Sequence, residues 1–164
     1  MNSADWGKLV FFDTEEHEVT AEKSTLASVP ELAAQWKIIF DFKPTEYPKA
    51  GSQHVLWMST LGSDYKIGIN LWKGNIFLEV DDWGGLHSDL LPNLCEWTRI
   101  EISHEGEDGK YFITFSVGGK EVLRTEVDES DFGNLEDVKI HIGGFFSEWG
   151  QPGFVRGLSV LEKQ

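Results

Sequence analysis

The sequence has few cysteines, no long apolar run and little positive charge, and each shortage excludes a class of protein. Cys95 is the single cysteine among 164 residues, so no disulfide can form within the chain. No apolar stretch approaches the roughly 20 residues of a membrane-spanning helix, and the N-terminal segment lacks the apolar core of a signal peptide. The sequence therefore predicts no membrane insertion and a fold that does not depend on disulfides.

Basic residues are outnumbered by acidic ones. Lys and Arg number 14 against 28 Asp and Glu, which gives a net charge of −14. Nucleic acids and anionic membranes are bound by clusters of Lys and Arg, because these side chains displace counterions from phosphates. No such cluster is present, so nucleic acid is excluded as a predicted partner. The acidity has two remaining explanations, namely charge that keeps the protein dispersed in water and bound divalent cations.

Alternating apolar and polar residues recur along the chain and predict β-strands. In residues 36–42, every second residue is Trp, Ile or Phe, and Lys37 and Asp41 lie between them, so one face of the strand turns to a core and the other to water. The same alternation occurs in four further runs, residues 65–71, 76–80, 111–117 and 138–142. About eleven or twelve short strands at such spacings are typical of an antiparallel sandwich.

Turn residues separate these runs, and one segment has a helix signal. Gly118-Gly119 lies between two alternating runs, where glycine supplies the positive φ of a two-residue hairpin. Ser28 and Glu31 have the spacing of a capping box, which predicts one short helix over residues 29–34. For residues 1–164 the sequence thus predicts a single all-β domain, an antiparallel β-sandwich (jelly roll) with that one helix.

Four segments follow one another in an order that resembles a known superfamily. They are VPELAAQWKIIFDFKP, WTRIEISHEGEDGKYFITFSVGGKEV, VKIHIGG and the closing PGFVRGLSVLE. This order resembles the concanavalin A-like lectin and glucanase superfamily, with its laminin-G-like, pentraxin-like and galectin-like jelly rolls. The resemblance covers roughly residues 8 to 162. It implies a carbohydrate-binding fold and favours an extracellular location, although the chain shows no signal peptide.

The glucanases of this superfamily are similar to the chain in one catalytic motif, which is incomplete here. Family-16-like enzymes carry Glu-x-Asp-x-Glu on one strand, and Glu79 and Asp81 match its first two acids. Trp83 stands in the place of the second glutamate. Retaining hydrolysis needs two carboxylates about 5–5.5 Å apart. The sequence therefore predicts no enzyme, and a degenerate glycoside hydrolase ranks behind every binding function.

The galectin-like sugar site is also incomplete. That site resembles Trp-Gly-x-Glu-x-Arg, but here Trp149-Gly150 is followed by Gln151-Pro152. Neither the glutamate nor the arginine is at its place, so a galectin-type β-galactoside site is not supported. Any saccharide site must then be built from other residues.

Acidic loops offer oxygen ligands of the kind that Ca²⁺ requires, six to eight in number. The candidate metal ligands are Asp81, Asp82 and Asp89. None of the acidic runs has the spacing of an EF-hand, and charged loops are commonly just solvated. Calcium is therefore a candidate cofactor, and the sequence indicates no other.

Aromatic residues in Gly-rich segments form the candidate binding surface. Trp36, Trp57 and Trp97 fall in predicted strands and are assigned to the core, whereas other rings lie in DDWGG and GGFFSEWGQPG. Exposed rings mark binding surfaces, and a sugar stacks its C–H face on a ring while its hydroxyls bond to polar groups. The predicted ligand-binding residues are Trp83, Trp149, Phe146, Asp81, Asp82 and Asn70.

The hypothesis is a non-enzymatic, lectin-like module that binds a glycan or glycoprotein, with calcium as a candidate aid. In the opposing interpretation the same rings fold back and clamp their own loop, as in Ω-loops. A second hypothesis is a protein-interaction or structural module that uses these rings to dock a protein or to form a homo-oligomer. A third is an apolar ligand held between the sheets, although core packing accounts for the aromatics more simply.

Overall fold

The structure is a computed structural model, and it describes residues 6–48, 52–72, 75–80, 84–88, 90, 92–145 and 150–163. Within these residues the chain forms twelve β-strands and one short helix. The elements are β1 (Lys8–Val19), β2 (Ser24–Leu32), β3 (Trp36–Pro44), β4 (Ser52–Thr60), β5 (Ser63–Trp72), β6 (Asn75–Val80), β7 (Gly84–His87), β8 (Thr98–Glu107), β9 (Lys110–Val117), β10 (Lys120–Val127), α1 (Glu129–Phe132), β11 (Leu135–Ile142) and β12 (Gly153–Glu162).

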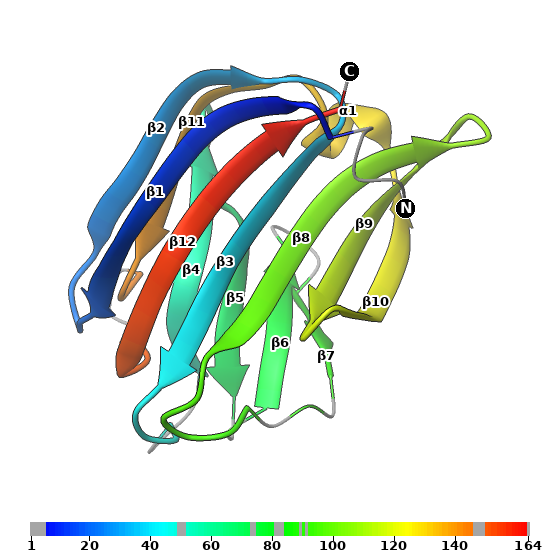
Figure 1. The fold of residues 1–164 in the computed structure, drawn as a ribbon. Coiled ribbons are helices and arrows are strands. Elements are labelled where there is room, and N and C mark those ends of the chain that lie inside the picture. The colour runs from blue at the N-terminus through cyan, green and yellow to red at the C-terminus, as the bar shows by residue number, and fades with distance from the viewer. Residues whose placement is uncertain are drawn as a thin grey trace.

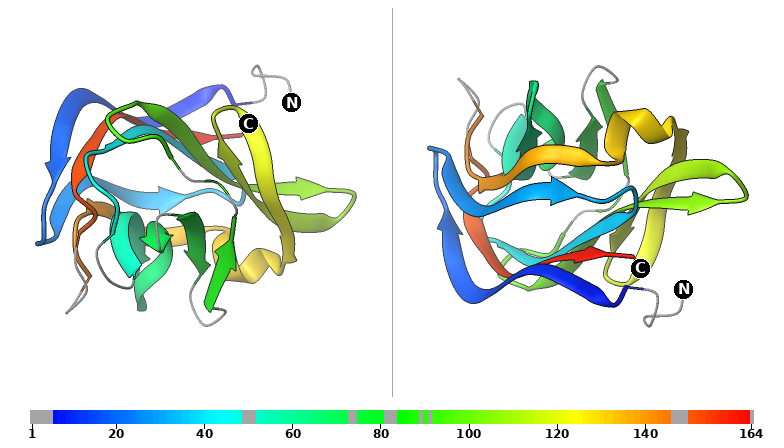
Figure 2. Two further views of the ribbon diagram at one scale, coloured as in Figure 1. Left: turned by 90° about the horizontal axis from the view of Figure 1, so that it is seen from below. Right: turned by 90° about the horizontal axis from the view of Figure 1, so that it is seen from above.

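Two six-stranded antiparallel sheets pack face to face (Figures 1 and 2). Sheet A has the order β1-β12-β3-β8-β9-β10, and sheet B has the order β2-β11-β4-β5-β6-β7. The first strand pairs with the last, so Lys8 and Glu162 lie side by side at one edge of sheet A. This architecture confirms the predicted antiparallel β-sandwich.

The predicted strands and hairpins are found where the alternation placed them. Residues 36–42, 65–71 and 111–117 lie in β3, β5 and β9. Gly118 and Gly119 join β9 to β10 with φ of 62° and 81°. Positive φ at both central residues is the geometry of a type I′ hairpin turn, which follows the right-handed twist of the strands.

The predicted helix at residues 29–34 is wrong. Residues 24–32 form β2, which pairs along its length with β11 and buries Ala27 and Val29 against the core. Pro30 is tolerated because β2 is the edge strand of sheet B, where one N–H need not join a ladder. The short helix is α1 instead. No helix within the described part of the chain is long and apolar enough to cross a membrane.

The core lies between the two sheets. Phe40 and Phe42 of β3 are fully buried and face it from sheet A, and Leu56 and Met58 of β4 face it from sheet B. Trp36 is also fully buried, as predicted, and its indole Nε1 donates a hydrogen bond of 2.6 Å to the carbonyl oxygen of Phe132. This bond ties α1 to the start of β3.

Candidate functional site

Most of the predicted site residues lie outside the described residues. Trp83, Trp149, Phe146, Asp81, Asp82 and Asp89 belong to this group, so their roles in ligand and calcium binding stay predictions. Asn70 is described, in β5, and is fully buried. Its amide Nδ2 donates to Glu79 Oε2 at 2.6 Å, and its Oδ1 accepts from the Tyr65 hydroxyl at 3.2 Å. Asn70 therefore orients two neighbouring side chains within sheet B.

Aromatic rings cluster on the outer face of β4 and β5 in sheet B. Leu56 and Met58 point into the core, so Trp57 between them points outward. Its ring stacks on Tyr65 with centroids 5.6 Å apart and an angle of 13°. Phe145, which follows β11, meets the Trp57 ring edge-on at 4.9 Å. Such offset and edge-on pairs are the favoured aromatic geometries, so the three rings form one rigid unit.

A glycine makes room for this stack. Gly68 of β5 lies directly opposite Trp57 of β4. A Cβ atom at Gly68 would overlap the hydroxyl of Tyr65 and press on Trp57. The Tyr65 ring thus occupies the space that any larger residue at position 68 would fill, and the stack depends on the missing side chain.

The segment after β11 is anchored on both this cluster and the β1–β2 connection. The indole Nε1 of Trp57 donates to the carbonyl oxygen of Gly143 at 3.1 Å. Gly143 has a φ of 92°, and a Cβ there would overlap the carbonyl oxygen of Glu22. Gly150 makes the same close approach to the carbonyl oxygen of Thr20. Glycine at both positions therefore lets the two backbones touch.

A cleft of about 580 Å³ opens between the β1–β2 connection and the outer face of β4 and β11. One wall comes from residues 21–23, and the floor comes from alternate residues of the two strands. The lining residues, which define the His141 cleft, are Ala21, Glu22, Lys23, Trp57, Ser59, Thr60, Asp64, Asp137, Lys139, His141, Gly144 and Phe145. The cleft thus combines ring edges, hydroxyls, carboxylates and two ammonium groups.

His141 lies at the floor of the cleft and is 3% exposed. Its Nδ1 is 2.8 Å from the Thr25 hydroxyl and its Nε2 is 2.8 Å from the Ser59 hydroxyl. Burial, and secondly the charges of Lys23 and Lys139, lower its pKa to about 4. The imidazole is therefore neutral at physiological pH, with one donor and one acceptor nitrogen, and both are matched by a hydroxyl that can play either part.

Sequence reasoning missed this cleft because its residues come from strands distant in the chain. Lys139 and His141 were recognisable as the polar side of an alternating strand. Nothing local shows that β11 pairs with β4, which sets His141 beside Trp57 with ring centroids 4.3 Å apart. Trp57 is buried as expected, at 3% exposure, but beneath the cleft and outside the inter-sheet core. Trp97 is half-buried and precedes β8.

Neither a family model nor a curated protein matches the sequence. Solved structures resemble the fold. A heptameric SAP-like pentraxin from Limulus polyphemus has 15% identity and a TM-score of 0.61, over 93% of this chain and 74% of its own. A second similar structure is domain 4 of AbnA, a GH43 extracellular arabinanase from Geobacillus stearothermophilus, in complex with arabinotriose. It has 12% identity and a TM-score of 0.61, over 95% of this chain and 93% of its own.

An enzyme is also among the similar structures. The endo-1,3-beta-glucanase from Streptomyces sioyaensis has 13% identity and a TM-score of 0.60, over 91% of this chain and 76% of its own. At these identities the likeness shows the fold alone. The protein has the concanavalin A-like jelly-roll fold, which enzymes and non-enzymes share.

The buried histidines predict a loss of stability in mild acid. The pKa of His141 is about 4 in the folded protein and about 6.5 when unfolded. The unfolded state therefore binds more protons below neutrality, and the free energy of unfolding falls by about 2 kcal/mol between pH 7.5 and 5 for this group. Burial lowers the pKa of His104 as well, in the same direction. His141→Gln should flatten the profile measured by urea unfolding, and an unchanged slope would contradict this assignment.

Gly143 tests the contact that forms the cleft wall. Gly143→Ala and Gly119→Ala both place alanine at a left-handed φ, of 92° and 81°, which costs about 1 kcal/mol in each case. At Gly119 nothing lies within 4 Å of the new Cβ, whereas at Gly143 it meets the Glu22 carbonyl. We expect Gly143→Ala to lower the free energy of unfolding by about 1–3 kcal/mol more, measured with urea. Equal losses would show that the two segments separate freely.

Proposed function

We propose that the protein is a non-enzymatic carbohydrate-binding module that holds a saccharide in the His141 cleft. The observation that carries the proposal is the composition of the cleft, where ring edges, hydroxyls and charged groups line one open space of about 580 Å³. Ligand sites commonly occupy about 300–1,000 Å³ and combine apolar surface with a few placed polar groups. The likeness to a domain solved with arabinotriose is a further support.

The polar groups of the cleft suit a ligand that both donates and accepts hydrogen bonds. Asp64 and Asp137 provide acceptor oxygens, and Lys139 provides a charged donor. Each sugar hydroxyl is at once donor and acceptor, so neighbouring carboxylate and ammonium groups can bond to the same saccharide. Hydrogen bonds that involve a charged group are stronger than neutral ones. Phe145, half-buried at the same cleft, offers apolar ring surface to the C–H groups of a sugar.

A glycan array followed by calorimetry, each with and without Ca²⁺, tests this function. Lys139→Ala should weaken saccharide binding at least tenfold, because charge-assisted bonds contribute about 1.5–3 kcal/mol. The matched control is Lys120→Ala, which removes the same charge from an exposed position on β10 in the other sheet. It should change the affinity less than twofold. Absence of any saccharide ligand, or equal effects of the two substitutions, would refute the proposal.

A second candidate function, self-association, is favoured by exposed apolar residues on an edge strand. Leu9 and Phe12 of β1 are 54% and 56% exposed, and β1 is the outermost strand of sheet A. An unpaired edge with apolar side chains is a template for pairing with another chain. One of the similar structures is a heptameric pentraxin.

Light scattering of the purified chain tests self-association. If β1 forms the interface, Phe12→Lys should reduce an oligomer to single chains, because it buries a charge between two copies. Leu61→Lys is the control, since Leu61 is 67% exposed and lies in the turn after β4. The mass should then stay that of the oligomer. A wild-type chain that is monomeric at all concentrations would remove this candidate.

A further inference from the structure

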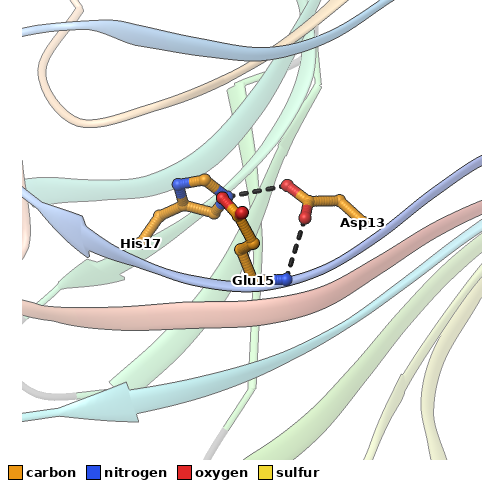
Figure 3. Close-up of side chains that lie close together, drawn as sticks. All are labelled: Asp13, Glu15 and His17. Atoms are coloured by element: carbon orange, nitrogen blue, oxygen red, sulfur yellow. Dashed lines mark hydrogen bonds and ion pairs between the residues drawn. The ribbon is translucent and has the colours of Figure 1, made fainter.

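Three side chains of types that can ligate a metal gather on β1, outside the set of residues predicted to bind calcium. The ligand atoms of Asp13, Glu15 and His17 all lie within 4.8 Å of one another. Figure 3 shows the three side chains on the same side of the strand, with the Glu15 carboxylate next to the contact between His17 and Asp13. Within the described residues, this is the one group of three or more His, Cys, Asp or Glu side chains that meets this distance.

The strand itself brings the three groups together. The ladder between β1 and β12 is irregular between Asp13 and Glu16. On the two sides of this irregularity Asp13 and His17 lie opposite Leu158 and Val155, which point into the sandwich. β1 is the edge strand of sheet A, so this face lies at the rim of the sandwich. The side chain of His17 is 28% exposed and that of Asp13 is 20% exposed. The groups are thus held by the sheet and remain accessible to an ion.

Local bonds orient the cluster. Asp13 Oδ1 accepts the backbone N–H of Glu15 at 2.8 Å, and Asp13 Oδ2 lies 2.7 Å from His17 Nε2. The Asp13 carboxylate is therefore already turned toward the imidazole before any ion binds.

We infer that Asp13, Glu15 and His17 form a binding site for a divalent transition-metal ion of the Zn²⁺ type. The imidazole nitrogen decides the kind of metal. Zn²⁺ accepts nitrogen together with carboxylate oxygen, whereas Ca²⁺ and Mg²⁺ are bound by oxygen ligands. Three protein ligands leave at least one coordination position for water. The site is independent of the saccharide proposal and uses none of the residues of the His141 cleft.

The geometry requires only small movements. Zn–ligand bonds of about 2.0–2.2 Å in a tetrahedral arrangement place the ligand atoms about 3.4 Å apart. His17 and Asp13 are already closer than this, and the ion would take the place of the proton that they share. Glu15 is exposed, so its side chain is free to rotate toward the other two. The backbone bond from Glu15 to Asp13 can remain and fix the carboxylate from outside.

Zn²⁺ titration by calorimetry, on the untagged full chain in buffer that contains Ca²⁺, tests the inference. We expect one Zn²⁺ per chain. His17→Ala and Asp13→Asn should each weaken binding at least tenfold. Glu15→Gln, at an exposed position that folding does not depend on, should weaken it as well. Circular dichroism of each variant confirms that it is folded.

The matched control is Glu16→Gln, which removes one negative charge beside Glu15. Glu16 is exposed and pairs with Arg156, on the other face of the strand. Its substitution should change Zn²⁺ affinity less than twofold. The inference is overturned if the wild-type chain binds no Zn²⁺ or if Ca²⁺ displaces Zn²⁺ from the site. It is also overturned if Glu16→Gln weakens Zn²⁺ binding as much as His17→Ala does.

Discussion

The pairing of β11 with β4 is the contact on which the rest of sheet B depends. On the inner face it sets Ile140 beside Met58 and Ile142 beside Leu56, all buried in the core. On the outer face it sets His141 beside Trp57 and within reach of the Ser59 hydroxyl. Core and cleft are therefore two faces of one ladder. If β11 slipped by one residue along β4, its inner and outer side chains would change places, and the imidazole of His141 would enter the apolar interior.

The cleft is rigid for reasons that lie outside it. The stack of Trp57 on Tyr65 needs the missing side chain of Gly68, and the close approach at Gly143 needs glycine again. Neither glycine lines the cleft, yet each fixes the position of a ring or a wall. Alternation of apolar and polar residues is enough to build the sandwich, and a few small residues decide which side chains its outer face can hold. Low sequence identity to other jelly rolls of the same shape is therefore expected.

The strands could be predicted from the sequence because alternation is a local pattern. The predictions failed where the deciding contact joins residues that are far apart in the chain. Residues 36–42 and 111–117 show their buried faces directly in the alternation. The capping-box pattern at Ser28 and Glu31 was a local signal too, but pairing with β11 outweighed it. The candidate site was hidden for the same reason, since His141 and Trp57 lie 84 positions apart and meet only in the ladder. The alternate positions of Asp13, Glu15 and His17 predict no site by themselves, and it is the structure that shows their side chains converging.

Two histidines illustrate why a net charge of −14 says little about any one site. His141 is buried, has a hydroxyl on each nitrogen and lies near two lysines, which help to keep its ring neutral. His17 is partly exposed and lies beside the carboxylate of Asp13 in a group with Glu15. The His141 ring therefore has no nitrogen left to bind a metal ion, and the two lysines would repel a cation. The His17 ring is partly exposed and has two carboxylates beside it. The same residue type is therefore suited to bind a cation there.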